Sequence, residues 1–87
     1  MKEILLIINA WDPMGFFPMA PEDEYINEIN MISEYVDSIS DIEEYKLAKK
    51  INEIFIKSFG SDVYTRDLNE CLNVAREIVY MLKRNKG

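Results

Sequence analysis

The apolar positions of this chain return every three or four residues, which is the spacing of a helix face rather than of a strand. The pattern is most regular near the carboxyl end. There it comprises Leu68, Cys71, Leu72, Ala75, Ile78, Val79 and Leu82. We predict a helix here, capped by Thr65 and with Asp67 in its first turn. Val74 and Met81 widen the apolar face, so we expect this helix to be the most central one.

An earlier helix is predicted to begin at Pro21. The N–H of the first residue in a helix has no partner within the helix, so proline, which has no N–H, suits that position. The acidic residues Glu22, Asp23 and Glu24 would then fill the first turn, where the helix dipole favours negative charge. The apolar stripe that follows consists of Tyr25, Ile29, Ile32, Val36 and Ile39.

The helix between these two is predicted to begin at Ser40, since Ser40 and Glu43 have the spacing of a capping box. Its apolar face is Ile42, Tyr45, Ala48, Ile51, Ile54, Phe55 and Phe59. Gly60 is expected to end it. The polar face carries Lys46, Lys49 and Lys50 without interleaved aromatic residues, so we interpret it as solvated surface rather than an RNA site.

The first segment, residues 2–10, admits two interpretations. Ile4, Leu5, Ile8 and Trp11 have helical spacing, whereas the β-branched content would also suit a buried strand. No second strand is evident to pair with it, so we expect a helix that stops before Pro13.

Together these segments predict an all-α fold. Only three glycines and three prolines occur in 87 residues, which argues against a sandwich or barrel. We therefore expect a single helical domain over residues 1–87, a compact bundle of three long helices plus a short N-terminal helix.

The residues that usually carry catalysis are scarce. The chain has no histidine, and its one cysteine, Cys71, sits on an apolar stripe where a thiol is normally an inert small hydrophobe. There is no glycine-rich phosphate loop and no zinc-spaced cysteine pair. We predict no catalytic residues, no cofactor and no metal site, and hence no enzyme. A cation held by Asp12 and the acids of residues 22–24 is the less favoured alternative.

Charge is unevenly distributed around a net value of −6. The first 45 residues carry one lysine against eleven acidic residues, and residues 46–87 carry nine basic against five acidic ones. The acidic half disfavours nucleic acid and favours a basic partner, although solubility alone also explains it. The apolar run of residues 4–8 is too short to span a membrane and lacks a cleavage site, so we expect a cytoplasmic protein.

The loop of residues 12–20 is rich in proline and large apolar side chains. If exposed, it would form an apolar anchor with an acidic rim, suited to a basic protein. The candidate partner-binding residues are Met14, Phe16, Phe17, Met19, Glu22, Asp23 and Glu24. The preferred alternative is that Phe16 and Phe17 fold back as a lid on the core.

A structural role is predicted for Trp11, Asp12, Pro13, Tyr25 and Glu28. Trp11 would pack at the end of the first helix, and Pro13 would direct the chain away from it. Asp12 could accept hydrogen bonds from nearby backbone N–H groups or from an indole N–H. Glu28, one turn after Tyr25, would hold the loop by a charge-assisted hydrogen bond.

These motifs resemble those of a known family. Trp11-Asp12-Pro13-Met14-Gly15, followed by Tyr25 and Glu28-Ile29, is similar to the YugE-like proteins, small bacterial helical proteins of unknown function. Further matches extend the resemblance to Leu82. They are Ala48, Ile51, Ile54, Phe55, Ser58, Phe59, Cys71, Ala75 and Ile78. The resemblance implies a compact helical fold and no established activity.

The stretch from Trp11 to Ile29 also resembles the opening of some bacterial immunity proteins, which neutralise polymorphic or contact-dependent toxins. We therefore expect a non-enzymatic protein-binding module, an immunity protein that neutralises a basic toxin domain being the specific form. The alternative is a YugE-like stand-alone regulator or small-ligand binder. A monomer and a homodimer formed through the last helix both remain open.

Overall fold

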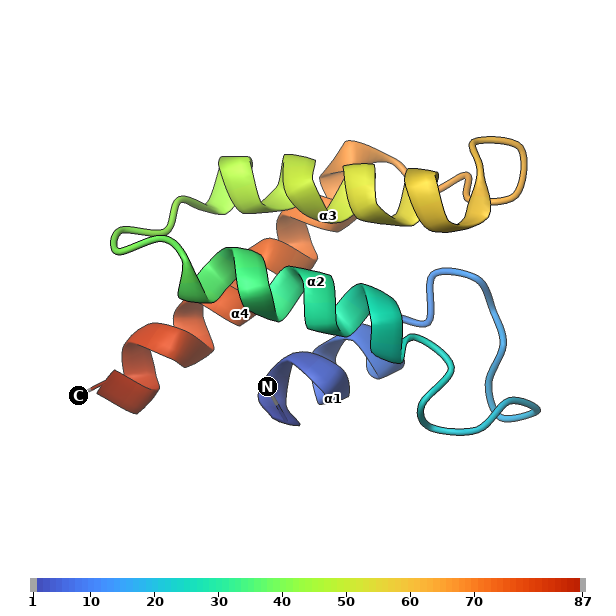
Figure 1. Cartoon of the computed structure of the whole chain (residues 1–87), viewed down its shortest axis with the longest axis horizontal. Helices are drawn as coiled ribbons and strands as arrows, with labels where there is room; N and C mark the ends of the chain where they lie inside the picture. Colours follow the sequence, from blue (N-terminus) through green and yellow to red (C-terminus); the bar gives the residue numbers. More distant parts are fainter. Residues whose placement is uncertain (1, 87) are drawn as a thin grey trace.

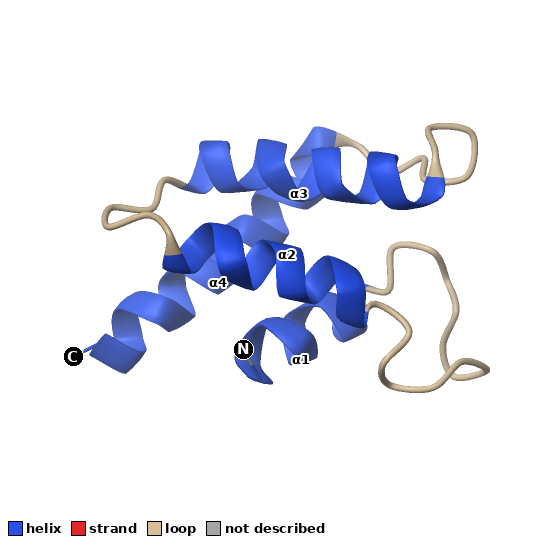
Figure 2. Ribbon diagram, viewed as in Figure 1, coloured by secondary structure: helices blue, strands red, loops and turns tan. Residues whose placement is uncertain are grey.

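The computed structural model describes residues 2–86, and in that range it is built from four helices without a strand (Figures 1 and 2). They are α1 (Lys2–Trp11), α2 (Ile26–Asp37), α3 (Glu44–Phe59) and α4 (Leu68–Lys86). The predicted all-α fold of three longer helices and a short N-terminal one is confirmed. The segment at residues 2–10 is a helix and not a strand.

The four helices pack in the order α1, α2, α3, α4 and back to α1, so each has two helical neighbours. Figure 1 shows α2 and α3 side by side in front, with α4 crossing behind them and α1 next to the start of α2. The central position expected of α4 is shared with α3, because these two helices pack more extensively than α1 and α2 do. The closest packing of α4 is against α3.

The core is formed by the apolar stripes that the helical spacing predicts. Its buried members are Ile4, Ile8, Tyr25, Ile29, Ile32, Val36, Leu47, Ala48, Ile51, Ile54, Phe55, Tyr64, Cys71, Val74, Ala75, Ile78 and Val79. Tyr45, placed in the core by the sequence, is 56% exposed, and Leu47 is buried instead. Leu47 shares one helix face with Ile51 and Ile54, and Tyr45 lies outside that arc.

The start of α2 differs from the prediction. It begins at Ile26 rather than at Pro21, because residues 21–25 form turns in which Glu24 N–H donates to Pro21 C=O and Ile26 N–H to Asp23 C=O. The acidic residues 22–24 therefore precede the helix instead of filling its first turn. Tyr25, the residue before the helix, has its ring in the core.

The predicted start of α3 is also wrong. Glu43 precedes the helix with an extended backbone, and no side chain caps it, so Ser40 does not form a capping box. A helix that began at Ser40 would leave only two residues to cross from α2, which ends at Asp37. The end of α3 is as predicted, because Gly60 adopts a φ of 85°, which L side chains rarely do.

The cap of α4 is Asp67 and not Thr65. Oδ1 of Asp67 accepts a hydrogen bond from the backbone N–H of Glu70 at 2.9 Å. This is the bond that an N-cap makes to the third residue of a helix, and it sets the start of α4 at Leu68.

Candidate functional site

The loop that follows α1 is organised by the carboxylate of Asp12. Oδ1 accepts hydrogen bonds from the Phe16 N–H at 2.9 Å and from the Tyr25 hydroxyl at 2.6 Å, and Oδ2 accepts one from the Phe17 N–H at 3.1 Å. The backbone of Asp12 has a φ of 47°, a conformation that aspartate tolerates better than most residues. The predicted bonds from nearby N–H groups to Asp12 are therefore present.

Tyr25 closes the loop from the other side. Its hydroxyl donates to Asp12 and accepts a hydrogen bond from the Met14 N–H at 3.0 Å. Its ring is fully buried, with Phe16 stacked on it at 5.5 Å between centroids and Phe17 edge-on at 5.8 Å. We call Asp12, Tyr25 and the backbone groups that they bind the loop clasp.

The protonation states of the loop clasp are well defined. Burial raises the pKa of Tyr25, and its bond to Asp12 raises it further, so the hydroxyl stays protonated and donates. Burial would also raise the pKa of Asp12. The hydrogen bonds from Tyr25, Phe16 and Phe17 outweigh that effect, so the pKa of Asp12 is lowered and its carboxylate stays charged.

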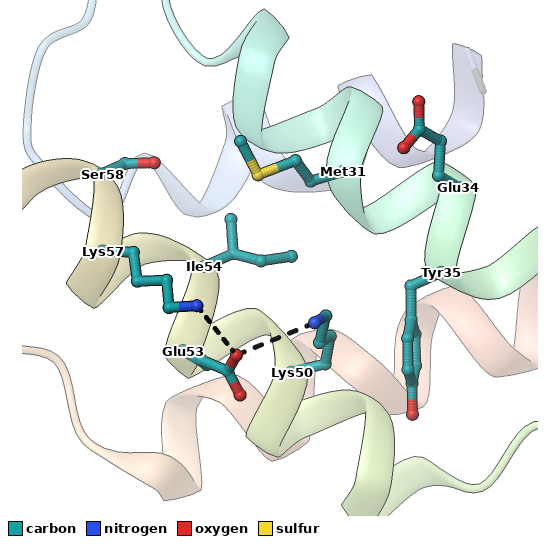
Figure 3. Close-up of a pocket in the computed structure, with 8 residues that line it drawn as sticks. All are labelled: Met31, Glu34, Tyr35, Lys50, Glu53, Ile54, Lys57 and Ser58. Carbon is teal, nitrogen blue, oxygen red and sulfur yellow. Dashed lines mark ion pairs between the residues drawn. The ribbon is translucent and has the colours of Figure 1, made fainter.

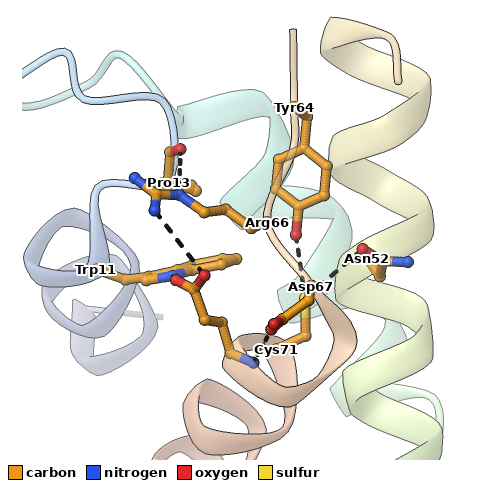
Figure 4. Close-up of polar contacts among 8 residues, drawn as sticks. Trp11, Pro13, Asn52, Tyr64, Arg66, Asp67 and Cys71 are labelled. Carbon is orange, nitrogen blue, oxygen red and sulfur yellow. Dashed lines mark hydrogen bonds and ion pairs between the residues drawn. The ribbon is translucent and has the colours of Figure 1, made fainter. Parts of the chain in front are cut away.

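Trp11 and Pro13 join the loop to the second half of the chain (Figure 4). The Trp11 indole N–H donates to Oε1 of Glu70 at 3.1 Å, and the Arg66 Nε–H donates to the Pro13 carbonyl at 3.0 Å. Arg66 and Glu70 also face each other, with Nη1 and Oε2 3.9 Å apart. Sequence reasoning missed both partners, because they lie more than 50 residues from the loop. Their only local signal is the i,i+4 spacing of opposite charges.

The predicted role of Glu28 is not observed. Its side chain is only 6% exposed, yet within the described residues no hydrogen bond joins it to the loop. Asn9 of α1 supplies a link instead, because its Nδ2 donates to the Glu22 carbonyl at 2.9 Å. The residue that bonds to the loop is Tyr25, three positions before Glu28, through its hydroxyl to Asp12.

The seven candidate partner-binding residues divide into two groups. Met14, Phe16 and Phe17 are half-buried and pack against the core, Phe16 lying edge-on to Phe59 at 6.0 Å. The two phenylalanines thus form the lid that the preferred interpretation expected. Met19 is 93% exposed, and the side chains of Glu22, Asp23 and Glu24 are exposed as well. We call these last four residues the acidic tip.

Cys71 is buried on α4, where its sulfur lies 3.0 Å from the Tyr64 hydroxyl and 3.8 Å from Oδ1 of Asn52 (Figure 4). Burial raises the pKa of the Cys71 thiol, and the nearby acids Glu70 and Asp67 add to the effect. A protonated, buried thiol is a poor nucleophile. The geometry is that of a core side chain.

A groove of about 460 Å³ runs between α2 and α3 (Figure 3). Figure 3 shows Met31 of α2 and Ile54 of α3 at its centre. Oε1 of Glu53 binds the ammonium groups of both Lys50, at 3.8 Å, and Lys57, at 3.6 Å. We call this the α2–α3 groove.

Aromatic rings accompany the lysines of α3, contrary to the prediction. The Lys50 ammonium lies 5.7 Å from the ring centroid of Tyr35, and the Lys49 ammonium is equally far from that of Tyr45. Tyr35 belongs to α2, so its proximity to Lys50 arises only from the packing of two helices. Lys46 and Lys49 are exposed, so this face is solvated as predicted, and the two rings are an addition that the sequence did not indicate.

The described residues, 2–86, also bear on metal binding and on membrane insertion. Nowhere in that range do three His, Cys, Asp or Glu side chains come together as a set of metal ligands. Asp12 points at Tyr25 and the loop backbone, which separates it from the acidic tip. None of the helices in the same range is long and apolar enough to cross a membrane.

Comparisons with known proteins identify a family. Searches of curated proteins and of solved structures found no match. The sequence profile of one family, described as a domain of unknown function (DUF1871), matches residues 3–86, from α1 to the end of α4. The chain therefore belongs to the DUF1871 family.

Proposed function

We propose that this protein is a non-enzymatic protein-binding module whose acidic tip contacts a basic partner. The observation that carries the proposal is the 93% exposure of Met19 beside the exposed acids Glu22, Asp23 and Glu24. A single exposed apolar side chain is common on protein surfaces, so the support comes from the three acids beside Met19, which would give an apolar anchor a charged rim. An immunity protein that neutralises a basic toxin domain is the specific form that we propose.

The backbone around the acidic tip is held before any partner arrives. The loop clasp fixes the N–H groups of Phe16 and Phe17, and the Ala20 N–H donates to the Phe16 carbonyl at 3.0 Å. On the far side of Met19, Asn9 holds the Glu22 carbonyl. A loop that is already ordered loses less conformational entropy on binding, which supports a role in recognition.

The charges of the acidic tip are free to act on a partner. Within the described residues, no ion pair involves the side chains of Glu22, Asp23 or Glu24. Three unpaired carboxylates in an acidic half of the chain would accelerate encounter with a basic surface, and the acceleration would weaken with salt.

The test uses the product of a neighbouring gene that encodes a basic toxin domain, titrated calorimetrically with the purified protein. We expect Met19→Asp to weaken binding about tenfold or more, as for an anchor residue. Asp23→Lys should also weaken it and should reduce its salt dependence. Asp62→Lys is the matched control, because it reverses the charge of an exposed aspartate in the turn after α3.

Two outcomes would reject the proposal. One is that no basic toxin domain is encoded nearby or that none binds. The other is that Asp23→Lys and Asp62→Lys change the affinity equally, because binding would then depend on net charge alone.

A further inference from the structure

We propose that the α2–α3 groove binds an acidic amphipathic helix of a partner protein. This site is separate from the acidic tip, and the charges along its α3 edge are of the opposite sign. Three observations support it: an exposed apolar floor, an excess of lysines along one edge, and a length suited to a short helix.

The floor of the groove is apolar, and its exposed part is Met31. Met31 is 47% exposed and lies between the two helices with Ile54, a core residue that is only 4% exposed (Figure 3). Tyr35 extends this surface toward the start of α3. Methionine is flexible and adapts to different side chains, which is why it is common on surfaces that bind helices.

The two edges of the groove carry different charges. The α3 edge presents Lys46, Lys49, Lys50 and Lys57. Two acids lie beside them, Glu53 and Glu43, and Glu43 pairs with Lys46 at 3.6 Å, so the lysines outnumber the acids by two. Each ammonium has three donors, so the single Glu53 oxygen that binds Lys50 and Lys57 leaves most of their donors unused. The α2 edge contributes Glu34 and no basic residue. An occupant with carboxylates along one side would therefore place them against α3.

The length of the lysine-lined surface favours a helix over a compact ligand. The groove continues into a depression of about 230 Å³ that shares Tyr35, Lys50 and Glu53 with it and adds Lys46 and Lys49. From Lys46 to Ser58, this surface follows thirteen residues of α3, or about 18 Å at the rise of a helix. A partner helix of about three turns would cover it.

Nucleic acid fits this surface less well. Glu53 lies among the lysines and Glu34 belongs to the α2 edge, and both would repel a phosphate backbone, as would the net charge of −6. A peptide helix can place single carboxylates beside the lysines and leave Glu34 facing neutral or basic side chains.

The probe is a stapled, fluorescein-labelled peptide of about 14 residues, long enough for the groove and stable as a helix. It carries leucines at helical spacing on one face and glutamates along one flank. A second peptide has lysine in place of each glutamate. Fluorescence polarisation gives the affinities, and methyl NMR of Met31 and Ile54 locates the binding site.

We expect the acidic peptide to bind about tenfold or more tightly than the basic one, with shifts at both methyl groups. Exchanging Lys50 and Lys57 together for glutamate should reverse this preference. Lys83→Glu with Arg84→Glu is the matched control, because it makes the same charge change at exposed positions of α4 and should leave the preference intact. Met31→Asn, at an exposed site, should weaken both peptides, because it removes apolar contact without changing the charge.

Three results would overturn the proposal: no binding of either peptide, equal binding of both, or shifts confined to residues outside the groove. Dodecanoate that shifts the methyl groups of Met31 and Ile54, with no binding of the acidic peptide, would overturn the proposal and assign the groove to small anionic amphiphiles instead. Met19→Asp and Asp23→Lys should not alter peptide binding, so failure here is distinguishable from failure of the proposed function.

Discussion

The Tyr25 hydroxyl lies 2.6 Å from Oδ1 of Asp12 and joins the chain just before α2 to the residue just after α1. This bond crosses the whole proline-containing loop and is reinforced by the Met14 N–H on the same hydroxyl. It ties the loop to the folded core, whereas the side chains of the acidic tip stay exposed.

Removal of the Asp12 carboxylate should destabilise the protein strongly. Asp12→Ala leaves two backbone N–H groups and the Tyr25 hydroxyl without their acceptor, and we expect it to cost about 2–3 kcal/mol. Tyr25→Phe keeps the ring packing and should cost about 1–2 kcal/mol. Urea unfolding followed by circular dichroism measures both. Asp41→Ala, at an exposed acid between α2 and α3, is the control, and an equal loss there would contradict the role of Asp12.

The same carboxylate should make stability depend on pH in the acidic range. The folded pKa of Asp12 is lowered below its ordinary value of 3.8, so the unfolded chain binds the proton more readily. Its stabilising contribution is complete above about pH 5 and is lost as the pH falls through the folded pKa. The difference in unfolding free energy between wild type and Asp12→Asn should therefore narrow on acidification. A difference that is constant down to about pH 2 would refute this assignment.

The start of α4 offers a direct comparison of two capping residues. Asp67→Ala removes the bond to the Glu70 N–H and should cost about 1 kcal/mol. Thr65→Ala changes an exposed side chain that caps no helix and should stay within about 0.5 kcal/mol of wild type. Thermal unfolding of the two variants decides between them, and the opposite order would restore Thr65 as the cap.

Cys71 should be protected from thiol reagents in the folded protein. Burial and a raised pKa lower both access and thiolate content, so iodoacetamide at about pH 8 should react about a hundredfold more slowly than in urea. Mass spectrometry of timed samples gives the two rates. Tyr64→Phe keeps the covering ring and should preserve the protection. Similar rates in the native and unfolded states would show that the thiol is accessible.

Much of the fold was predictable because helical periodicity is local. The faces of α1, α2 and α4 follow from apolar spacing within each segment, and Gly60 ends α3 through its own backbone preference. Helix starts were less predictable, because Pro21, Ser40 and Thr65 each have a local signal that packing overrides. In each case the helix begins a few residues later, at Ile26, Glu44 and Leu68.

By itself the sequence determined four helical segments, the faces they bury and a carboxylate that binds the backbone after α1. These properties depend on residues within a few positions of one another. Only the tertiary structure decided that Tyr25 rather than Glu28 meets Asp12, that Trp11 bonds to Glu70, and that Tyr35 stands beside Lys50. Those contacts join residues 13 to 59 positions apart, so they depend on how the helices pack, which no local pattern encodes.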